Sequence, residues 1–259
     1  FTATADSEVT PSTIAKDGFN SPAAKTVKVS ANGDTTIEYN YTRKTFTLTV
    51  ERREGVASVT VTGKTTGTVT KIESAEGANA DNYTVVYGAT FNMSSTASTG
   101  YTVAGFEGLE ANTDKTYTMP MADTVVAAVA TPNRYKVILN VNADGVSTTL
   151  GAVDENTNTI TLWAVYNRDY TVLYANETAV EGETSVSLAA FTKDTIKLTG
   201  HTFAGFYTNR YDADQVAAGV AAVAATDKFL PSASGDVVDD TTLYAYWTIN
   251  SYTLTVEYY

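Results

Sequence analysis

The sequence predicts a mainly β protein in which related modules follow one another. Apolar and polar residues alternate over most of the 259 residues, and the strand formers threonine, valine and tyrosine are abundant. The passage DTTIEYNYTRKTFTLTVE at 34–51 recurs at 240–257 as DTTLYAYWTINSYTLTVE. Nearly the same heptapeptide occurs at 100–106 (GYTVAGF) and 200–206 (GHTFAGF). Recurrence of this kind is typical of tandem modules.

Composition limits the functions that this chain can serve. Its formal net charge of −12 disfavours nucleic acid and an anionic membrane as partners, because both carry negative charge. The absence of cysteine excludes disulfides, thiol nucleophiles and cysteine-bound metal, and a single histidine leaves no His–His pair. No window approaches about 18 apolar residues, so membrane insertion is not expected.

Similar junctions divide the chain, and each joins a β-patterned run through a polar step to a strand that begins with an aromatic residue. They centre on Phe46, Tyr135, Tyr170 and Tyr252. We therefore expect a section of a longer tandem array. The predicted domains are 1–45, the C-terminal part of a preceding module; 46–134, a repeat module; 135–251, a second repeat module; and 252–259, the first strand of a following module.

Local patterns add three expectations. One helix is predicted over about 212–225, with Asp212 or Asp214 as its N-cap, although Gly219 weakens it by about 1 kcal/mol relative to alanine. Asn32–Gly33 predicts a tight turn that pairs a strand at 26–30 with one at 35–41. Residues 135–169 do not fit a complete module, so an extra hairpin or a truncated unit is expected there. The apolar face of the helix would consist of Val216, Val220 and Val223.

Several of these segments resemble a known family. The aromatic-led strand at 170–174, the heptapeptide at 200–206 and Thr-Leu-Tyr-Ala-Tyr-Trp at 242–247 resemble the Listeria–Bacteroides repeat, also called the internalin-type B repeat. The match is best over 170–251. The first module resembles it through its heptapeptide, and Tyr-Thr-Met-Pro at 117–120 resembles related bacterial repeats. The stretches 22–27 and 32–34 resemble the tail of another such module.

The resemblance implies small ubiquitin-like β-grasp modules strung in tandem on bacterial surface proteins. Such repeats serve as stalks, spacers or adhesive segments, so the expected function is a non-enzymatic, extracellular part of a cell-surface protein. Its expected partner is a protein or glycan on a host or neighbouring cell. Two alternatives stay open: a filament or surface-lattice subunit that self-associates through the strand at 251–259 by β-strand addition, and a carbohydrate-binding module.

No catalytic, cofactor-binding or metal site is predicted, but some polar residues need an interpretation. His201 occupies the position of Tyr101 in the other heptapeptide, so a half-buried aromatic position is expected rather than a ligand. The stretch NVNADG at 140–145 resembles the start of a calcium loop, but Gly151 stands where the acidic residue is required, which favours a turn. A second acidic loop contains Asp236, Asp239 and Asp240, and we expect it to be solvated.

Aromatic residues could form a platform for sugar rings. Its candidate members are Trp163, Tyr166, Tyr207, Tyr211 and Tyr246. The alternative is that Trp163 and Trp247 pack in module cores. The lysines Lys136 and Lys197 alternate with apolar residues and should face outward, which disfavours buried Lys–Asn isopeptide crosslinks. Glycosylation sequons, which are weak matches, begin at Asn40, Asn82, Asn92 and Asn176.

Overall fold

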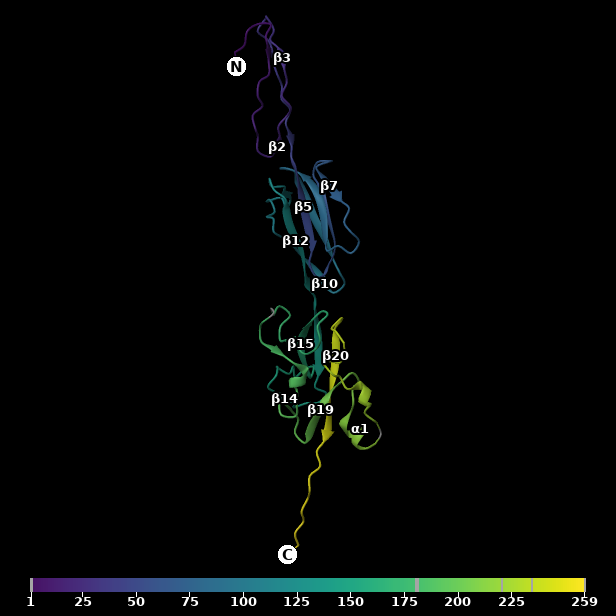
Figure 1. The fold of residues 1–259 in the computed structure, drawn as a ribbon. Helices are drawn as coiled ribbons and strands as arrows, with labels where there is room; N and C mark the ends of the chain where they lie inside the picture. The colour runs from purple at the N-terminus through teal and green to yellow at the C-terminus, as the bar shows by residue number, and fades with distance from the viewer. Residues whose placement is uncertain (1, 180–181, 220, 234, 259) are drawn as a thin grey trace. The chain divides into compact units, whose positions relative to one another are not determined.

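A computed structural model describes residues 2–179, 182–219, 221–233 and 235–258 of the chain (Figure 1). The predicted mainly β class is confirmed, and α1 (Ala213–Ala217) is the one α-helix in this described part. The chain forms two compact units, residues 1–131 and 132–259. The sequence placed the corresponding boundary between residues 134 and 135. None of the described helices is long and apolar enough to cross a membrane.

The first 44 residues of the first unit form two short strand pairs. The strand β1 (Glu8–Val9) pairs with β3 (Val27–Lys28), and β2 (Phe19–Asn20) pairs with β4 (Thr42–Arg43), both antiparallel. No hydrophobic side chain among the described residues up to 44 is fully buried. This region therefore has strand pairing without a core.

The predicted hairpin around Asn32–Gly33 is only half correct. A turn is present, and Gly33 has the positive φ of 77° that such a turn requires. The pairing of 26–30 with 35–41 is wrong, because β3 bonds to β1 and residues 35–41 form no strand. Side-chain bonds hold that stretch in place: the Tyr39 and Tyr41 hydroxyls donate to the carbonyls of Pro11 and Ile14.

The rest of the first unit consists of two sheets around one core. A five-stranded sheet has the order β10-β12-β5-β8-β7, and a three-stranded sheet has the order β11-β9-β6. The strands are β5 (Thr45–Arg52), β6 (Val56–Gly63), β7 (Val69–Ile72), β8 (Ala80–Val86), β9 (Thr90–Ala97), β10 (Tyr101–Glu107), β11 (Tyr117–Thr118) and β12 (Thr124–Pro132). Alternation buries one face of each sheet, and Leu48, Phe91 and Val126 are fully buried in the shared core.

The second unit has one large sheet with the order β17-β16-β15-β13-β20-β19, and a separate β14-β18 pair. The strands are β13 (Arg134–Asn140), β14 (Ser147–Thr148), β15 (Thr159–Val165), β16 (Leu173–Tyr174), β17 (Ser185–Val186), β18 (Ile196–Lys197), β19 (His201–Tyr207) and β20 (Thr241–Ile249); the 3₁₀ helix η1 is Leu188–Ala190. Leu139, Leu162, Leu243 and Trp247 belong to its core.

Residues 135–169 supply three of these strands. They form β14 and the antiparallel pair β13–β15, and β13 lies between β15 and β20. This stretch is therefore part of the same sheet as residues 170–251. The aromatic-led strand predicted from Tyr170 is largely absent, since only β16 forms there. The Asp169 carboxylate accepts the backbone N–H of Thr171 at 3.0 Å and folds the chain into a turn instead.

The predicted helix exists but is much shorter than 212–225. Asp212 is its N-cap and accepts the Gln215 N–H at 3.0 Å, as expected for one of the two candidates. The helix ends at Ala217, Ala218 is its C-cap, and Gly219 follows with a φ of +72°. None of its residues is buried, so no packed apolar face extends it. Val220 lies outside the described residues, and the next helical turn is the 3₁₀ helix η2 (Ala225–Asp227).

Candidate functional site

A parallel pair of strands lies in the main sheet of each unit. In the first unit β12 runs parallel to β5, and in the second β20 runs parallel to β13. The register is equivalent, because Thr124 is opposite Leu48 and Thr241 is opposite Val137. Along the chain, each pair thus joins the first strand of the main sheet to its last strand.

An aspartate closes each parallel pair in the same way. Asp123 precedes β12 and accepts the backbone N–H of Thr47 at 2.7 Å. Asp240 precedes β20 and accepts the backbone N–H of Lys136, also at 2.7 Å. In both units this N–H belongs to the residue before the first register pair. The carboxylate satisfies a donor that the ladder leaves open at its end.

The first strand of each pair supplies two fully buried side chains. These are Leu48 and Val50 in β5, and Val137 and Leu139 in β13. Their spacing of two places both members on the same face of the sheet. The parallel pair is therefore both a hydrogen-bonded ladder and the centre of each core.

A glycine turn next to the last strand also recurs. The carbonyl of Gly200 accepts the backbone N–H of Asn250 at 2.9 Å, and Gly200 has a φ of +74°. In the N-terminal region the carbonyl of Gly18 accepts the N–H of Lys44 at 2.9 Å, and Gly18 has a φ of +76°. The flanking pairs also correspond, with β2–β4 in place of the start of β19–β20.

The backbone of residues 18–20 and 42–44 is therefore arranged like that of residues 200–202 and 248–250. The sequence comparison aligned 34–51 with 240–257, which gives the correspondence of residue 44 with residue 250. It did not reveal that Gly18-Phe19 corresponds to the Gly-aromatic start of the heptapeptide. The sequence signal for this correspondence is the glycine followed by an aromatic residue, which Gly18-Phe19 shares with Gly100-Tyr101 and Gly200-His201.

Residues 252–258, called here the exposed segment, are the most accessible apolar stretch. They carry no strand and continue from β20 as the yellow extended trace in Figure 1. Its alternating side chains are largely accessible: Tyr252 79%, Leu254 86%, Val256 58% and Tyr258 93% exposed. Within this chain the strand predicted at 252–259 does not form, and Tyr259 lies outside the described residues.

Residues 34–41, called here the open segment, have a complementary property. Their side chains alternate between exposed and half-buried, with Ile37, Tyr39 and Tyr41 half-buried. In the described chain, no backbone–backbone hydrogen bond involves residues 34–41. The Glu38 carbonyl accepts from the Lys25 ammonium at 2.7 Å, so a side chain and not a neighbouring strand bonds to the backbone of this segment.

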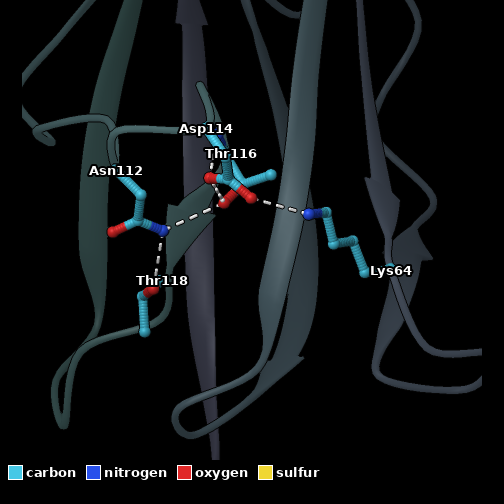
Figure 2. Close-up of polar contacts among 5 residues, drawn as sticks. All are labelled: Lys64, Asn112, Asp114, Thr116 and Thr118. Carbon is cyan, nitrogen blue, oxygen red and sulfur yellow. Dashed lines mark hydrogen bonds and ion pairs between the residues drawn. The ribbon is translucent and has the colours of Figure 1, made fainter.

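A polar cluster fixes the loop between β10 and β11, and Figure 2 shows its members. The Asp114 carboxylate accepts the backbone N–H of Thr116 at 3.1 Å and its hydroxyl at 2.5 Å, and it pairs with the Lys64 ammonium at 2.7 Å. The Asn112 amide donates to the hydroxyls of Thr116 and Thr118, each at 3.0 Å. The hydrogen bond from Lys64, then the two hydrogen bonds from Thr116 and last the charge of Lys64 lower the pKa of Asp114 well below its usual range.

This cluster is a loop clamp rather than a reaction centre. Its five polar side chains are linked by hydrogen bonds and one ion pair, and Thr116 is buried. The ion pair with Lys64 favours the ionised form of the Asp114 carboxylate, which cannot donate a proton as an acid.

Asp81 is the buried carboxylate of the first unit and is 5% exposed. Its oxygens pair with Arg52 on the neighbouring strand β5 and with Lys71 on β7, the latter at 2.9 Å. The hydrogen bond to Asp81 raises the pKa of Lys71, and burial raises the pKa of the adjacent Tyr83. The three charges cross β5, β8 and β7 and tie this half of the sheet together.

The aromatic candidates do not form one platform. Tyr207, Tyr211 and Tyr246 make a cluster of edge-to-face rings with centroids 5.6 to 6.0 Å apart, and Tyr207 and Tyr246 are buried. The Tyr211 hydroxyl donates to Asp227, so the cluster fastens the segment between β19 and β20. Burial raises the pKa of Tyr207, and the bond to Asp227 raises that of Tyr211.

The two tryptophans have different environments. Trp247 is 3% exposed, and its indole N–H donates to the Val141 carbonyl at 2.8 Å, as a core position requires. The core prediction is wrong for Trp163, which is half-buried beneath the Lys136 ammonium at 5.5 Å. It lies on the opposite face because its neighbours in β15, Leu162 and Ala164, point into the core. Tyr166 is near Tyr135, with ring centroids 6.3 Å apart.

The polar loops form structural turns. Asn142 has a φ of 57° and accepts from Arg210, while its amide donates to the carbonyls of Tyr211 and Ala245. Asp144 accepts from Asn158 at 2.6 Å. In the second acidic loop Asp240 closes the parallel pair, and Asp239 accepts the Asp240 N–H. Across the described residues, no group of three or more His, Asp or Glu could hold a metal ion.

His201 is half-buried at the start of β19, as the comparison with Tyr101 predicts. Its Nδ1 lies 2.9 Å from the Thr199 carbonyl, which is a local contact. An apolar cleft of about 430 Å³ lies nearby in the same unit. Its lining includes Leu188, Phe191, Phe203, Phe206, Phe229 and Pro231, together with Lys193 and Lys228. Such a lining suits an apolar group but provides no acid or histidine for catalysis.

The remaining candidates are surface features. Lys136 and Lys197 are exposed, as predicted. Of the sequon asparagines, Asn40, Asn92 and Asn176 are exposed, whereas Asn82 is half-buried in β8 and accepts from Thr49.

Comparisons with known proteins add no information on function. A scan against protein-family models and searches of curated proteins and of solved structures find no match to this chain.

Proposed function

We propose that the chain is a non-enzymatic, extracellular section of a bacterial cell-surface protein, built of β-grasp-like modules of the Listeria–Bacteroides type that act as a stalk or adhesion unit. The observation that carries this proposal is the recurring parallel pair with its aspartate. Asp123 with Thr47 and Asp240 with Lys136 have the same geometry in two units that fold around separate cores. The recurrence supports two copies of one module.

The parallel pair also suits a load-bearing role. In the second unit β13 is the first strand of the sheet along the chain and β20 is the last. A pull on the two ends of the unit therefore draws these two parallel strands in opposite directions. The hydrogen bonds of the ladder then bear the load together instead of opening one by one. A stalk that carries a binding tip to a protein or glycan on another cell needs this resistance.

Single-molecule stretching of the chain tests the proposal. Two separate unfolding events, each with the length of one unit, are expected. Asp240→Ala should lower the force of one event and leave the other unchanged, whereas Asp236→Ala, in the same exposed loop, should alter neither. A single event for the whole chain would contradict the modular arrangement.

A second candidate function is a subunit of an extracellular filament or surface lattice that grows by β-strand addition. The observation that favours it is the exposure of Leu254 (86%) and Tyr258 (93%) in an alternating strand pattern. Removal of residues 250–259 should abolish any assembly seen by electron microscopy. Unchanged assembly after that removal would exclude this function.

A further inference from the structure

We propose that the apolar cleft beside β19 binds a small amphiphilic carboxylate, such as a medium-chain fatty acid. The apolar body of this ligand lies against the phenylalanines of the cleft, and its carboxylate is held by the lysines of the cleft, Lys193 and Lys228. The site is independent of the mechanical role proposed above, because its lining belongs to the second unit and includes no residue of the β13–β20 ladder.

Phenylalanine rings form the apolar wall of the cleft. Phe206 lies at the centre of this wall, and its ring meets those of Phe191 and Phe203 edge to face, with centroids 5.4 and 5.1 Å apart. All three rings are buried, and Phe229 is half-buried beside them. Rings packed in this way hold one another in place, so the cleft is formed before a ligand arrives. Its volume of about 430 Å³ is in the range of small-molecule sites.

The lining of the cleft has a charge opposite to that of the chain. The chain has 29 Asp and Glu against 17 Lys and Arg, yet the described lining contains two lysines and no acidic residue. A second hollow of about 360 Å³ shares Lys193 and Phe203 with the cleft, and it adds Lys197 and His201, again without an acid. A positive lining on an acidic chain selects an anion and disfavours a cation.

The two lysines of the cleft are available to an anion. Within the described part of the chain, neither Lys193 nor Lys228 takes part in an ion pair. Both are exposed, so a carboxylate that reaches them displaces water rather than a protein partner. A hydrogen bond between an ammonium and a carboxylate is stronger than one between neutral groups, and it orients the ligand with its apolar end inward.

Gly205 leaves room for Lys228 on β19. A Cβ placed on Gly205 would lie 2.9 Å from the Cε of Lys228 and 3.5 Å from its Nζ, so a larger residue would displace the lysine. In the other heptapeptide, no atom lies within 4 Å of a Cβ placed on Gly105. Val103 stands there in place of Phe203 and is 40% exposed. The heptapeptide of the second unit therefore has a lysine and a buried ring that the first one lacks.

The backbone beside the cleft favours a small molecule over a peptide strand. The Phe229 N–H donates to the Phe206 carbonyl at 2.9 Å, and Tyr207 forms an isolated antiparallel bridge with Lys228. Residues 228–229 therefore already bond to β19 at the cleft. A peptide strand that adds to a sheet needs such backbone groups. An apolar chain with one carboxylate needs only the apolar wall and a lysine.

Calorimetric titration of the full chain with sodium decanoate tests the site, and amide NMR locates the binding. Saturable binding is expected, with signal changes concentrated at residues 188–193, 203–206 and 228–231. Nonanoate should bind about fourfold more weakly, because it buries one CH₂ fewer. Acetate, which has the carboxylate without the apolar body, should give no measurable binding. Binding that does not saturate, or signal changes spread over both units, would overturn the inference.

A cationic amphiphile tests the role of charge. Decyltrimethylammonium has the same chain length as decanoate but the opposite charge, and it should bind at least tenfold more weakly. Replacement of both lysines, Lys193→Gln with Lys228→Gln, should weaken decanoate binding about tenfold and leave the binding of the uncharged decanol unchanged. Lys136→Gln is the control, because Lys136 is an exposed lysine of the same unit outside the cleft. Equal affinities for the two charged amphiphiles would overturn the inference.

A matched pair of surface substitutions tests the position of the site. Leu230 lines the cleft and is 52% exposed, whereas Val238 is 64% exposed and lies outside it. Leu230→Asp removes apolar surface and adds a negative charge, so decanoate should bind at least tenfold more weakly. Val238→Asp adds the same charge elsewhere and should leave binding unchanged. Thermal melts verify that both variants keep their fold, and equal effects of the two on decanoate binding would place the site elsewhere and overturn the inference.

Discussion

The carboxylate of Asp240 accepts the backbone N–H of Lys136 at 2.7 Å, across 104 residues of chain. Asp123 makes the same bond to Thr47 across 76 residues. Each hydrogen bond joins the residue before the last strand of a sheet to the first strand of that sheet. In the second unit the contact lies directly before the first position of the parallel register, which the fully buried Val137 occupies.

Loss of this contact should destabilise one unit only. Asp240→Ala removes a charged acceptor and leaves the Lys136 N–H to water, so we expect about 1 kcal/mol less stability for the second unit. Urea unfolding followed by NMR, with signals from both units, measures it. Asp236→Ala is the control, and an equal effect of the two substitutions would show that Asp240 has no special role.

Asp81 should matter more, because its carboxylate is buried and its neighbours are charged. Asp81→Asn leaves Arg52 and Lys71 without their counter-charge, and a loss of roughly 1–3 kcal/mol is expected for the first unit. Glu51→Gln breaks an exposed pair with Arg53 and should cost well under about 1 kcal/mol. Denaturant midpoints of the two variants compare them directly, and similar values would argue against a structural role for the triad.

Alternation along the sequence predicted the class of the fold, because burial on one face of a strand depends on local pattern alone. The interpretation that Trp163 and Trp247 pack in module cores is correct for Trp247 and wrong for Trp163, which is half-buried. The aspartate contacts could not be predicted, since they depend on tertiary register between distant segments. The length of α1 was also misjudged: alanine and valine spacing indicates a possible apolar face, but the structure buries no residue of that helix.

Of the two candidate surface segments, the sequence predicted one and not the other. The repeat of 34–51 at 240–257 pointed to the exposed segment from the sequence. The state of residues 35–41 did not follow from it, because the turn at Gly33 was interpreted as a hairpin. Only the structure shows that β3 pairs with β1 and leaves the open segment without a ladder.

Acid should weaken the clamp around Asp114. Its pKa is lower in the folded chain than the ordinary 3.8, so its stabilising effect is fully present above that pH. It is lost progressively as the pH falls below 3.8 toward the folded-state value. Melting temperatures between pH 2 and 7 should decline less steeply in Asp114→Asn than in the unaltered chain. Parallel pH profiles for the two proteins would contradict the assignment.

Trp247 and Trp163 offer a matched pair of substitutions in one sheet. Trp247→Phe removes the indole N–H that bonds to the Val141 carbonyl and leaves a small cavity in the core, so a loss of roughly 2 kcal/mol is expected. Trp163→Phe changes a half-buried ring on the other face and should cost about 0.5 kcal/mol. Thermal unfolding measures both. Equal losses would mean that Trp163 contributes as much packing as Trp247, and the division of this sheet into a core face and an outer face would then be wrong.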